Sequence, residues 1–170
     1  KRRWRKDEPA YLGFIRSAVE RDHSSSTTDS ILELDSEKDR LNLLRSVSER
    51  IWEADFESYS RFTGQKLIFK TGDETVLNII AGGGGICSEK VQALKFLTDN
   101  LGYESEYLLA GPNAEKPIPE EKLRELLTTF EFDFSKRYMR YWEHMALLYH
   151  LDGSDIVVDA TNGNMPFIFL

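Results

Sequence analysis

The one cysteine of this chain, Cys87, follows the glycine run Gly82–Gly85 and Ile86, at the point where a helical pattern begins. The N-terminus of a helix carries roughly half a positive charge, which stabilises a thiolate. Cys87 is therefore a candidate nucleophile. Since a lone cysteine is more often a small hydrophobic core residue, this hypothesis requires a base that takes the thiol proton and a third group that orients the base.

Three histidines are candidates for the base. His23 lies in a polar stretch rich in serine and threonine, where we expect it to be solvated. His144 and His150 lie on a predicted strand over residues 142–151, and their spacing of six residues places both on the same face of that strand. Spacing alone leaves either of the two as the base.

A second predicted strand, residues 154–160, follows a two-residue turn, which is either Asp152-Gly153 or Gly153-Ser154. With either turn, His144 and Asp159 lie on the same face of the hairpin; the first turn makes them diagonal neighbours, roughly 5 to 8 Å apart at the β-carbons. A three-residue loop would reverse this parity. Asp159 follows three apolar β-branched residues, and a carboxylate in such a strand needs a partner. We therefore predict His144, at the open end of the hairpin, as the base and Asp159 as its orienting group.

These residues resemble the transglutaminase-like cysteine superfamily, in which a cysteine on a helix precedes a histidine and an aspartate on adjacent strands, in papain-like order. The resemblance implies acyl transfer or amide hydrolysis through a thioester, with Cys87 as nucleophile, His144 as general base and acid, and Asp159 as orienting carboxylate. It implies as partners a protein or small-molecule acyl donor and an amine acceptor. The resemblance spans roughly residues 74–161 and rests on Gly84–Glu89, Leu101–Tyr103, His144–Leu148 and Val157–Thr161.

Within that superfamily, Gly84–Glu89 is similar to the Arg-Gly-Gly-x-Cys-x-Glu motif of arylamine N-acetyltransferases, with Gly83 in place of the arginine. This second resemblance implies a structural salt link for Glu89 and, as an alternative function, acetyl transfer with acetyl-CoA as cofactor. The ending Asp159–Thr161 is closer to the Asp-x-Thr of transglutaminase-type sequences. A further alternative is a non-catalytic interaction module that keeps the same fold.

Composition excludes several other classes. The net charge of −7 disfavours general binding to nucleic acid or to anionic membranes, and the basic run Lys1–Lys6 is expected to be a solvated arm. One cysteine excludes an intrachain disulfide and a multi-cysteine zinc site, and it favours a reducing compartment such as the cytoplasm. No apolar stretch approaches the ~20 residues of a membrane span. No Gly-Lys-Ser/Thr follows the glycine run, which disfavours a nucleotide loop. Acyl transfer by a cysteine, a histidine and an aspartate requires neither a metal nor a cofactor.

From the expected helices and strands we predict an α+β fold with a papain-like or transglutaminase-like core. In this fold the cysteine-bearing helix packs on an antiparallel sheet. We expect a helical N-terminal region over residues 1–72, with a Ser/Thr-rich loop near 24–30, and a catalytic core over 73–170. The apolar end, residues 166–170, favours a chain that is part of a longer protein. The patterns predict helices over 9–21, 36–59, 74–80, 87–100 and 119–130, a short extended piece over 66–70 and a strand over 103–109.

Overall fold

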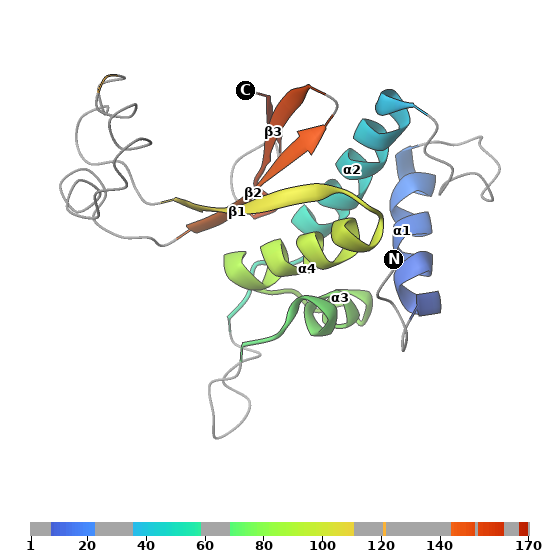
Figure 1. The fold of residues 1–170 in the computed structure, drawn as a ribbon. Coiled ribbons are helices and arrows are strands. Elements are labelled where there is room, and N and C mark those ends of the chain that lie inside the picture. The colour runs from blue at the N-terminus through green and yellow to red at the C-terminus, as the bar shows by residue number, and fades with distance from the viewer. Residues whose placement is uncertain are drawn as a thin grey trace.

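The computed structural model describes residues 8–22, 36–58, 69–110, 121, 144–151, 153–161 and 167–169. These residues form an α+β fold, as predicted, with the strands in one antiparallel sheet of order β1-β2-β3-β4 (Figure 1). None of the described helices is long and apolar enough to cross a membrane. The elements are α1 (Glu8–Asp22), α2 (Glu37–Trp52), α3 (Gly72–Ile80), α4 (Cys87–Asn100), β1 (Glu104–Ala110), β2 (His144–Leu151), β3 (Ser154–Val158) and β4 (Phe167–Phe169).

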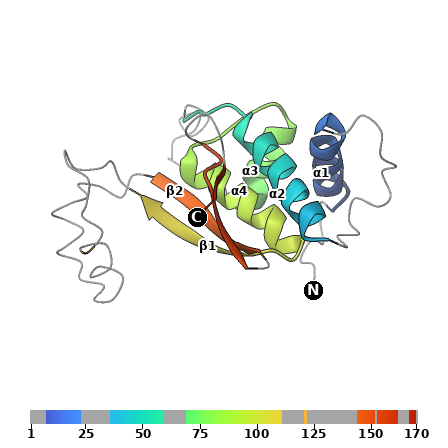
Figure 2. The ribbon, with the colours of Figure 1, turned by 90° about the horizontal axis from the view of Figure 1, so that it is seen from above.

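The helix α4 is the centre of the fold. It lies between the sheet on one side and α3 on the other, while α2 packs beside it and α1 lies next to α2 (Figures 1 and 2). One sheet face packs on the helices, because alternate residues of β2 and β3 belong to the same hydrophobic cluster as the inner residues of α4. The cluster includes Val47, Ile51, Val76, Leu94, Leu97, Leu147, Tyr149, Ile156 and Val158, all at most 1% exposed.

The bounds of α4 agree with the prediction from its start and stop signals. At its first turn the main-chain N–H of Ile86 donates to the Glu89 carboxylate over 3.1 Å, which satisfies a donor that the helix itself cannot. Its last residue is Asn100, and Gly102 then takes φ of 84°, a left-handed conformation that favours glycine and ends the helix. Cys87 is therefore the first residue of a well-bounded helix.

The hairpin of β2 and β3 has the first of the two predicted registers. Leu151 pairs with Ser154 and His150 with Asp155, as expected for a turn at Asp152-Gly153, and Gly153 has φ of 98°. On β1, Tyr107 pairs with Leu147, so β2 lies between two antiparallel neighbours. The parity on which the pairing of His144 with Asp159 depends is thus confirmed.

The predicted end of the second helix is wrong. The helix α2 begins as expected, with Ser36 Oγ accepting from the N–H of Asp39, but it ends at Trp52 instead of near residue 59. The apolar spacing continues to Phe56, yet residues 55–57 are extended because they pair with the main chain of Gly85. A tertiary contact here overrides the helical pattern.

Two shorter segments also differ from the prediction. The strand β4, Phe167–Phe169, pairs with β3 and was not predicted. Phe69 and Lys70, from the expected extended piece, belong to no strand. The basic run, the Ser/Thr-rich loop near 24–30, residues 66–68 and most of the expected helix over 119–130 lie outside the described residues.

Candidate active site

His144 and Asp159 meet at the start of β2. The Nε2 atom of His144 lies 2.6 Å from Oδ2 of Asp159, and both side chains are about one-fifth exposed (23% and 20%). The other oxygen of Asp159, Oδ1, accepts from the N–H and the hydroxyl of Thr161, each over 3.0 Å. Thr161 therefore orients Asp159, and Asp159 orients His144. With Nε2 bound by the carboxylate, Nδ1 is the ring nitrogen available for proton transfer.

His150, the other histidine on this strand face, belongs to a separate pair. Its Nδ1 atom lies 2.8 Å from Oδ1 of Asp155, and this hydrogen bond is the main cause that raises the pKa of His150. The pair is exposed and sits at the turn end of the hairpin. Six residues of strand, about 20 Å, separate His150 from His144. The structure therefore separates the two candidate bases, and only His144 lies at the open end.

The contact between Thr98 and Tyr149 shows which part of α4 lies beside which part of β2. Their hydroxyl groups lie 3.0 Å apart, and both side chains are buried. The helix and the strand run in the same direction, because β1 follows α4, reverses the chain and pairs antiparallel with β2 (Figure 1). Cys87 precedes Thr98 by eleven residues of helix, about 16 Å. His144 precedes Tyr149 by five residues of strand, also about 16 Å. From these equal lengths we infer that Cys87 and His144 lie toward the same end of α4 and β2.

Alternation along β2 shows how a thiol would approach the imidazole. Leu147 and Tyr149 face α4, so His144 belongs to the opposite set, with Ala146 and Leu148. The helix–sheet interface itself is filled with apolar side chains. A thiol at the first residue of α4 would therefore reach His144 around the end of β2, where the strand begins. The side chain of Cys87 is partly exposed.

The glycine run forms a loop of close main-chain contacts. The N–H of Gly85 donates to Asp55 O over 3.0 Å, and Gly85 O accepts from the N–H of Glu57 over 3.3 Å. A Cβ on Gly84 would lie 1.9 Å from Asp55 O, so no other residue fits there. The Asn78 side chain donates to Gly84 O over 2.8 Å. These contacts, which the sequence did not reveal, fix the loop that leads into Cys87.

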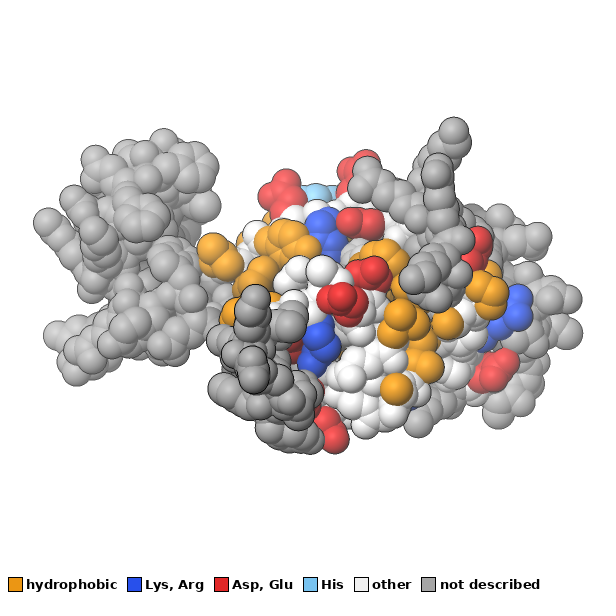
Figure 3. All heavy atoms as spheres, turned by 90° about the horizontal axis from the view of Figure 1, so that it is seen from below, with side chains coloured by type: hydrophobic (Ala, Val, Ile, Leu, Met, Phe, Trp, Pro, Cys, Tyr) orange, Lys and Arg blue, Asp and Glu red, His pale blue; other side chains and the backbone are white. Residues whose placement is uncertain are grey.

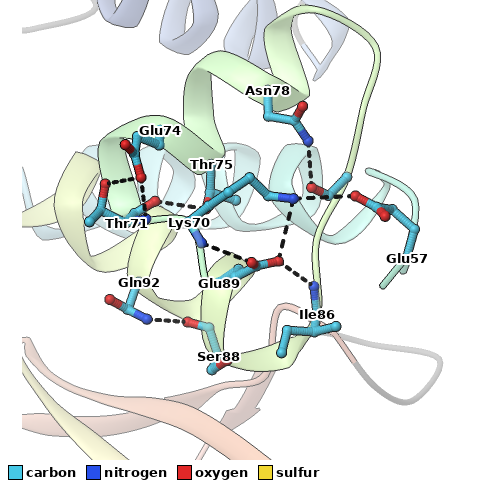
Figure 4. A network of polar contacts seen from close by, with 11 residues as sticks. Glu57, Lys70, Thr71, Glu74, Thr75, Asn78, Ile86, Ser88, Glu89 and Gln92 are labelled. Atoms are coloured by element: carbon cyan, nitrogen blue, oxygen red, sulfur yellow. Dashed lines mark hydrogen bonds and ion pairs between the residues drawn. The ribbon is translucent and has the colours of Figure 1, made fainter. Parts of the chain in front are cut away.

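Glu89 belongs to a buried ion network beside Cys87. Its carboxylate is fully buried, and accepts from the N–H groups of Ile86 and of Lys70. The ammonium group of Lys70 lies between two buried carboxylates, 3.6 Å from Glu89 Oε2 and 3.3 Å from Glu57 Oε1 (Figure 4). Glu89 thus has the salt link that the sequence resemblance implies, with Lys70 as the cation. Neither Lys70 nor Glu57 lies near the motif in the chain, so the sequence does not point to them.

Charges on the described surface are mixed in sign. Figure 3 shows acidic and basic side chains interspersed with small apolar groups on the face seen from below. Among the residues that the structure describes, no three His, Cys, Asp or Glu side chains are grouped so that they could hold a metal ion. At the start of β2 the structure brings together an imidazole and a carboxylate, His144 and Asp159, while Cys87 begins α4.

Comparisons with known proteins give no assignment. No protein-family model matches the chain, and no curated protein is significantly similar to it. A function can therefore be inferred only from the residues and contacts of the chain itself.

Proposed function

We propose that the chain catalyses acyl transfer or amide hydrolysis through a thioester on Cys87, with a core of the papain-like, transglutaminase-like type. The observation that carries this proposal is the 2.6 Å hydrogen bond between His144 and Asp159, together with the position of Cys87 as the first residue of α4. The chain order of cysteine, histidine and aspartate supports it. His144 also begins β2, and Asp159 directly follows β3, the antiparallel neighbour of β2.

In the first half of the reaction, His144 Nδ1 takes the Cys87 proton and the sulfur attacks the acyl carbonyl. Asp159 holds Nε2–H and stabilises the imidazolium that forms. The first N–H groups of a helix point toward its N-terminal end, so the N–H of Cys87 and the dipole of α4 would stabilise the oxyanion. When the carbonyl re-forms, the bond to the leaving amine breaks and His144 returns the proton to that amine. The product is an acyl thioester on Cys87.

In the second half, an amine or water attacks the thioester. His144 takes a proton from the attacking group, the bond from carbon to sulfur breaks, and the thiol of Cys87 is restored. An amine acceptor gives acyl transfer, and water gives hydrolysis. The acyl donor is a protein or small-molecule amide or ester, and a reducing compartment such as the cytoplasm would keep the thiol available.

The proposal is tested by trapping the thioester. The chain is incubated with p-nitrophenyl acetate, with a glutamine-containing peptide and with acetyl-CoA, and the intact protein is weighed by mass spectrometry. We expect an acyl adduct on Cys87 that an added amine or water removes. Cys87→Ala should abolish the adduct and His144→Ala should slow its formation, whereas His150→Ala, on the same strand face, should have no effect.

The donors also separate the alternatives. An adduct formed only from acetyl-CoA and discharged by an arylamine would assign the acetyltransferase function instead. A folded chain that forms no adduct with any donor would contradict both enzymatic functions and leave the non-catalytic interaction module. A variant such as His150→Ala that lost the adduct as fully as His144→Ala would contradict the assignment of the base.

A further inference from the structure

Lys90 is a fully buried lysine that the proposed reaction does not use. It lies one helical turn after Cys87 on α4 and is 1% exposed. Lysine is almost never fully buried unless its charge is paired. Here the ammonium group donates to two main-chain carbonyls, Trp52 O over 2.9 Å and Ala54 O over 2.8 Å.

Both acceptors lie at the C-terminal end of α2. The last carbonyls of a helix have no partner within it and carry partial negative charge, which favours a cation at that place. Lys90 therefore caps α2 from a different helix, α4. The cap holds residues 52–54 against the first turn of the helix that begins with Cys87.

The chain that leaves this cap returns directly to the nucleophile. Residues 55–57 continue from Ala54 in extended form and bind Gly85 through two main-chain hydrogen bonds. Gly85 precedes Cys87 by two residues. The contacts thus form a closed ring that runs from Lys90 to Ala54, along the main chain to Asp55, across to Gly85 and through Cys87 back to Lys90.

The charge of Lys90 also acts on the pair formed by His144 and Asp159. Burial lowers the pKa of Lys90 to about 8, while the nearby charges of Asp55 and Asp159 act in the opposite direction. Asp159 is the carboxylate that binds His144. The ammonium group is therefore in the electrostatic field of the histidine–aspartate pair, as well as in the ring that holds the thiol loop.

We propose that Lys90 is a positioning residue of the thiol site, which fixes the extended segment 55–57 and, through Gly85, the place of Cys87 relative to His144. The inference deepens the proposed function and rests on Cys87 as the nucleophile. A misplacement of about 1 Å can cost roughly 10²-fold in rate, so loss of the ring should be visible in the reactivity of the thiol.

The test compares Lys90→Met, which removes the donors, with Lys90→Arg, which keeps charge and donors. Lys95→Met is the matched control, because Lys95 lies on the same helix and binds Asp99 and Ser105 away from the site. Two rates are measured on folded protein: alkylation of Cys87 by iodoacetamide, and thioester formation at saturating p-nitrophenyl acetate. We expect Lys90→Met to lower both rates at least about tenfold with little change in KM, Lys90→Arg to restore most of the loss, and Lys95→Met to stay within about twofold.

Folded Lys90→Met with unchanged alkylation would overturn the proposal, and so would an equal loss in Lys95→Met. If Lys90→Met does not fold, amide exchange in the wild-type chain decides: the N–H groups of Gly85 and Glu57 must be protected, and rapid exchange at Gly85 overturns the ring. Different results refute the acyl-transfer function and the positioning role of Lys90. A wild-type chain that forms no thioester, but whose alkylation still depends on Lys90, refutes the acyl transfer and leaves the positioning role intact.

Discussion

The hydroxyl groups of Thr98 and Tyr149 lie 3.0 Å apart in the core, and this one contact joins the last turn of α4 to the middle of the sheet. It joins the C-terminal turn of α4 to the turn end of β2. Because equal lengths of helix and strand lead back from it, Cys87 and His144 come to the same end of the two layers.

Replacing Tyr149 by phenylalanine tests the strength of this contact. The Thr98 hydroxyl also donates to Leu94 O over 2.9 Å, so it keeps a partner in the variant. We expect Tyr149→Phe to lower the free energy of unfolding by about 0.5–1.5 kcal/mol, measured by urea denaturation. Tyr107→Phe, at a half-exposed position on β1, should change it by less than about 0.5 kcal/mol. Equal losses in both variants would mean that the buried pair contributes nothing specific.

Asp159→Asn should remove most of the activity and little of the stability. The amide can no longer accept from His144 as a carboxylate does, so the imidazole loses its fixed tautomer and its counter-charge. We expect the rate of thioester formation to fall roughly 10²- to 10⁴-fold. The hairpin supplies a matched control, Asp155→Asn, which alters the equivalent pair with His150 at 2.8 Å. Asp155→Asn should leave the rate unchanged, and a similar loss in both variants would contradict the assignment of the orienting group.

Substitution by alanine should have opposite effects on stability at two glycines, Gly84 and Gly13. A Cβ on Gly84 would meet Asp55 O at 1.9 Å, so alanine there must break the contact between the thiol loop and residues 55–57. We expect Gly84→Ala to destabilise the fold by more than about 2 kcal/mol. Gly13 lies within α1 with nothing within 4 Å of the added carbon, so Gly13→Ala should stabilise by about 0.5–1 kcal/mol. Thermal unfolding of the two variants measures both, and a stable Gly84→Ala would show that the loop can move away.

Lys70→Met should be strongly destabilising. The substitution removes the ammonium group from between the buried carboxylates of Glu57 and Glu89, and removing one partner of a buried ion pair costs about 3 kcal/mol or more. Lys38→Met, at an exposed position in the first turn of α2, should change the free energy of unfolding by less than about 0.5 kcal/mol. Urea denaturation compares the two. If Lys70→Met matched Lys38→Met, the network in Figure 4 would not stabilise the start of α4.

Local sequence patterns were sufficient to predict those parts of the site that depend on residues close together in the chain. Helix signals placed Cys87 at the start of α4, and the two-residue turn fixed the parity that brings His144 and Asp159 together. They were insufficient where distant segments meet. The spacing of Phe56 continues a helix, but pairing with Gly85 makes the chain extended. Likewise, nothing near Lys70 or Lys90 in the sequence announces carboxylate or carbonyl partners that lie 13 to 38 residues away.

The burial of Lys90 makes the stability of the fold depend on pH. Burial lowers its pKa from 10.5 to about 8 in the folded chain, so between these two values the unfolded chain binds more protons than the folded one. Stability then rises with pH in this interval, because deprotonation removes the cost of a buried charge. Relative to Lys90→Met, the free energy of unfolding of the wild type should increase by about 3 kcal/mol between pH 7.5 and pH 10.5.

The difference between the two proteins is the quantity to measure, by urea denaturation at each pH, because buried tyrosines act in the opposite direction. Burial raises the pKa of Tyr103 and of Tyr149, so above about pH 10 only the unfolded chain loses these protons and stability falls. Both tyrosines are present in Lys90→Met, and their effect cancels in the difference. A difference that stays flat from pH 7.5 to pH 10.5 would mean that Lys90 keeps its proton, and that carbonyls and nearby carboxylates offset the full cost of its burial.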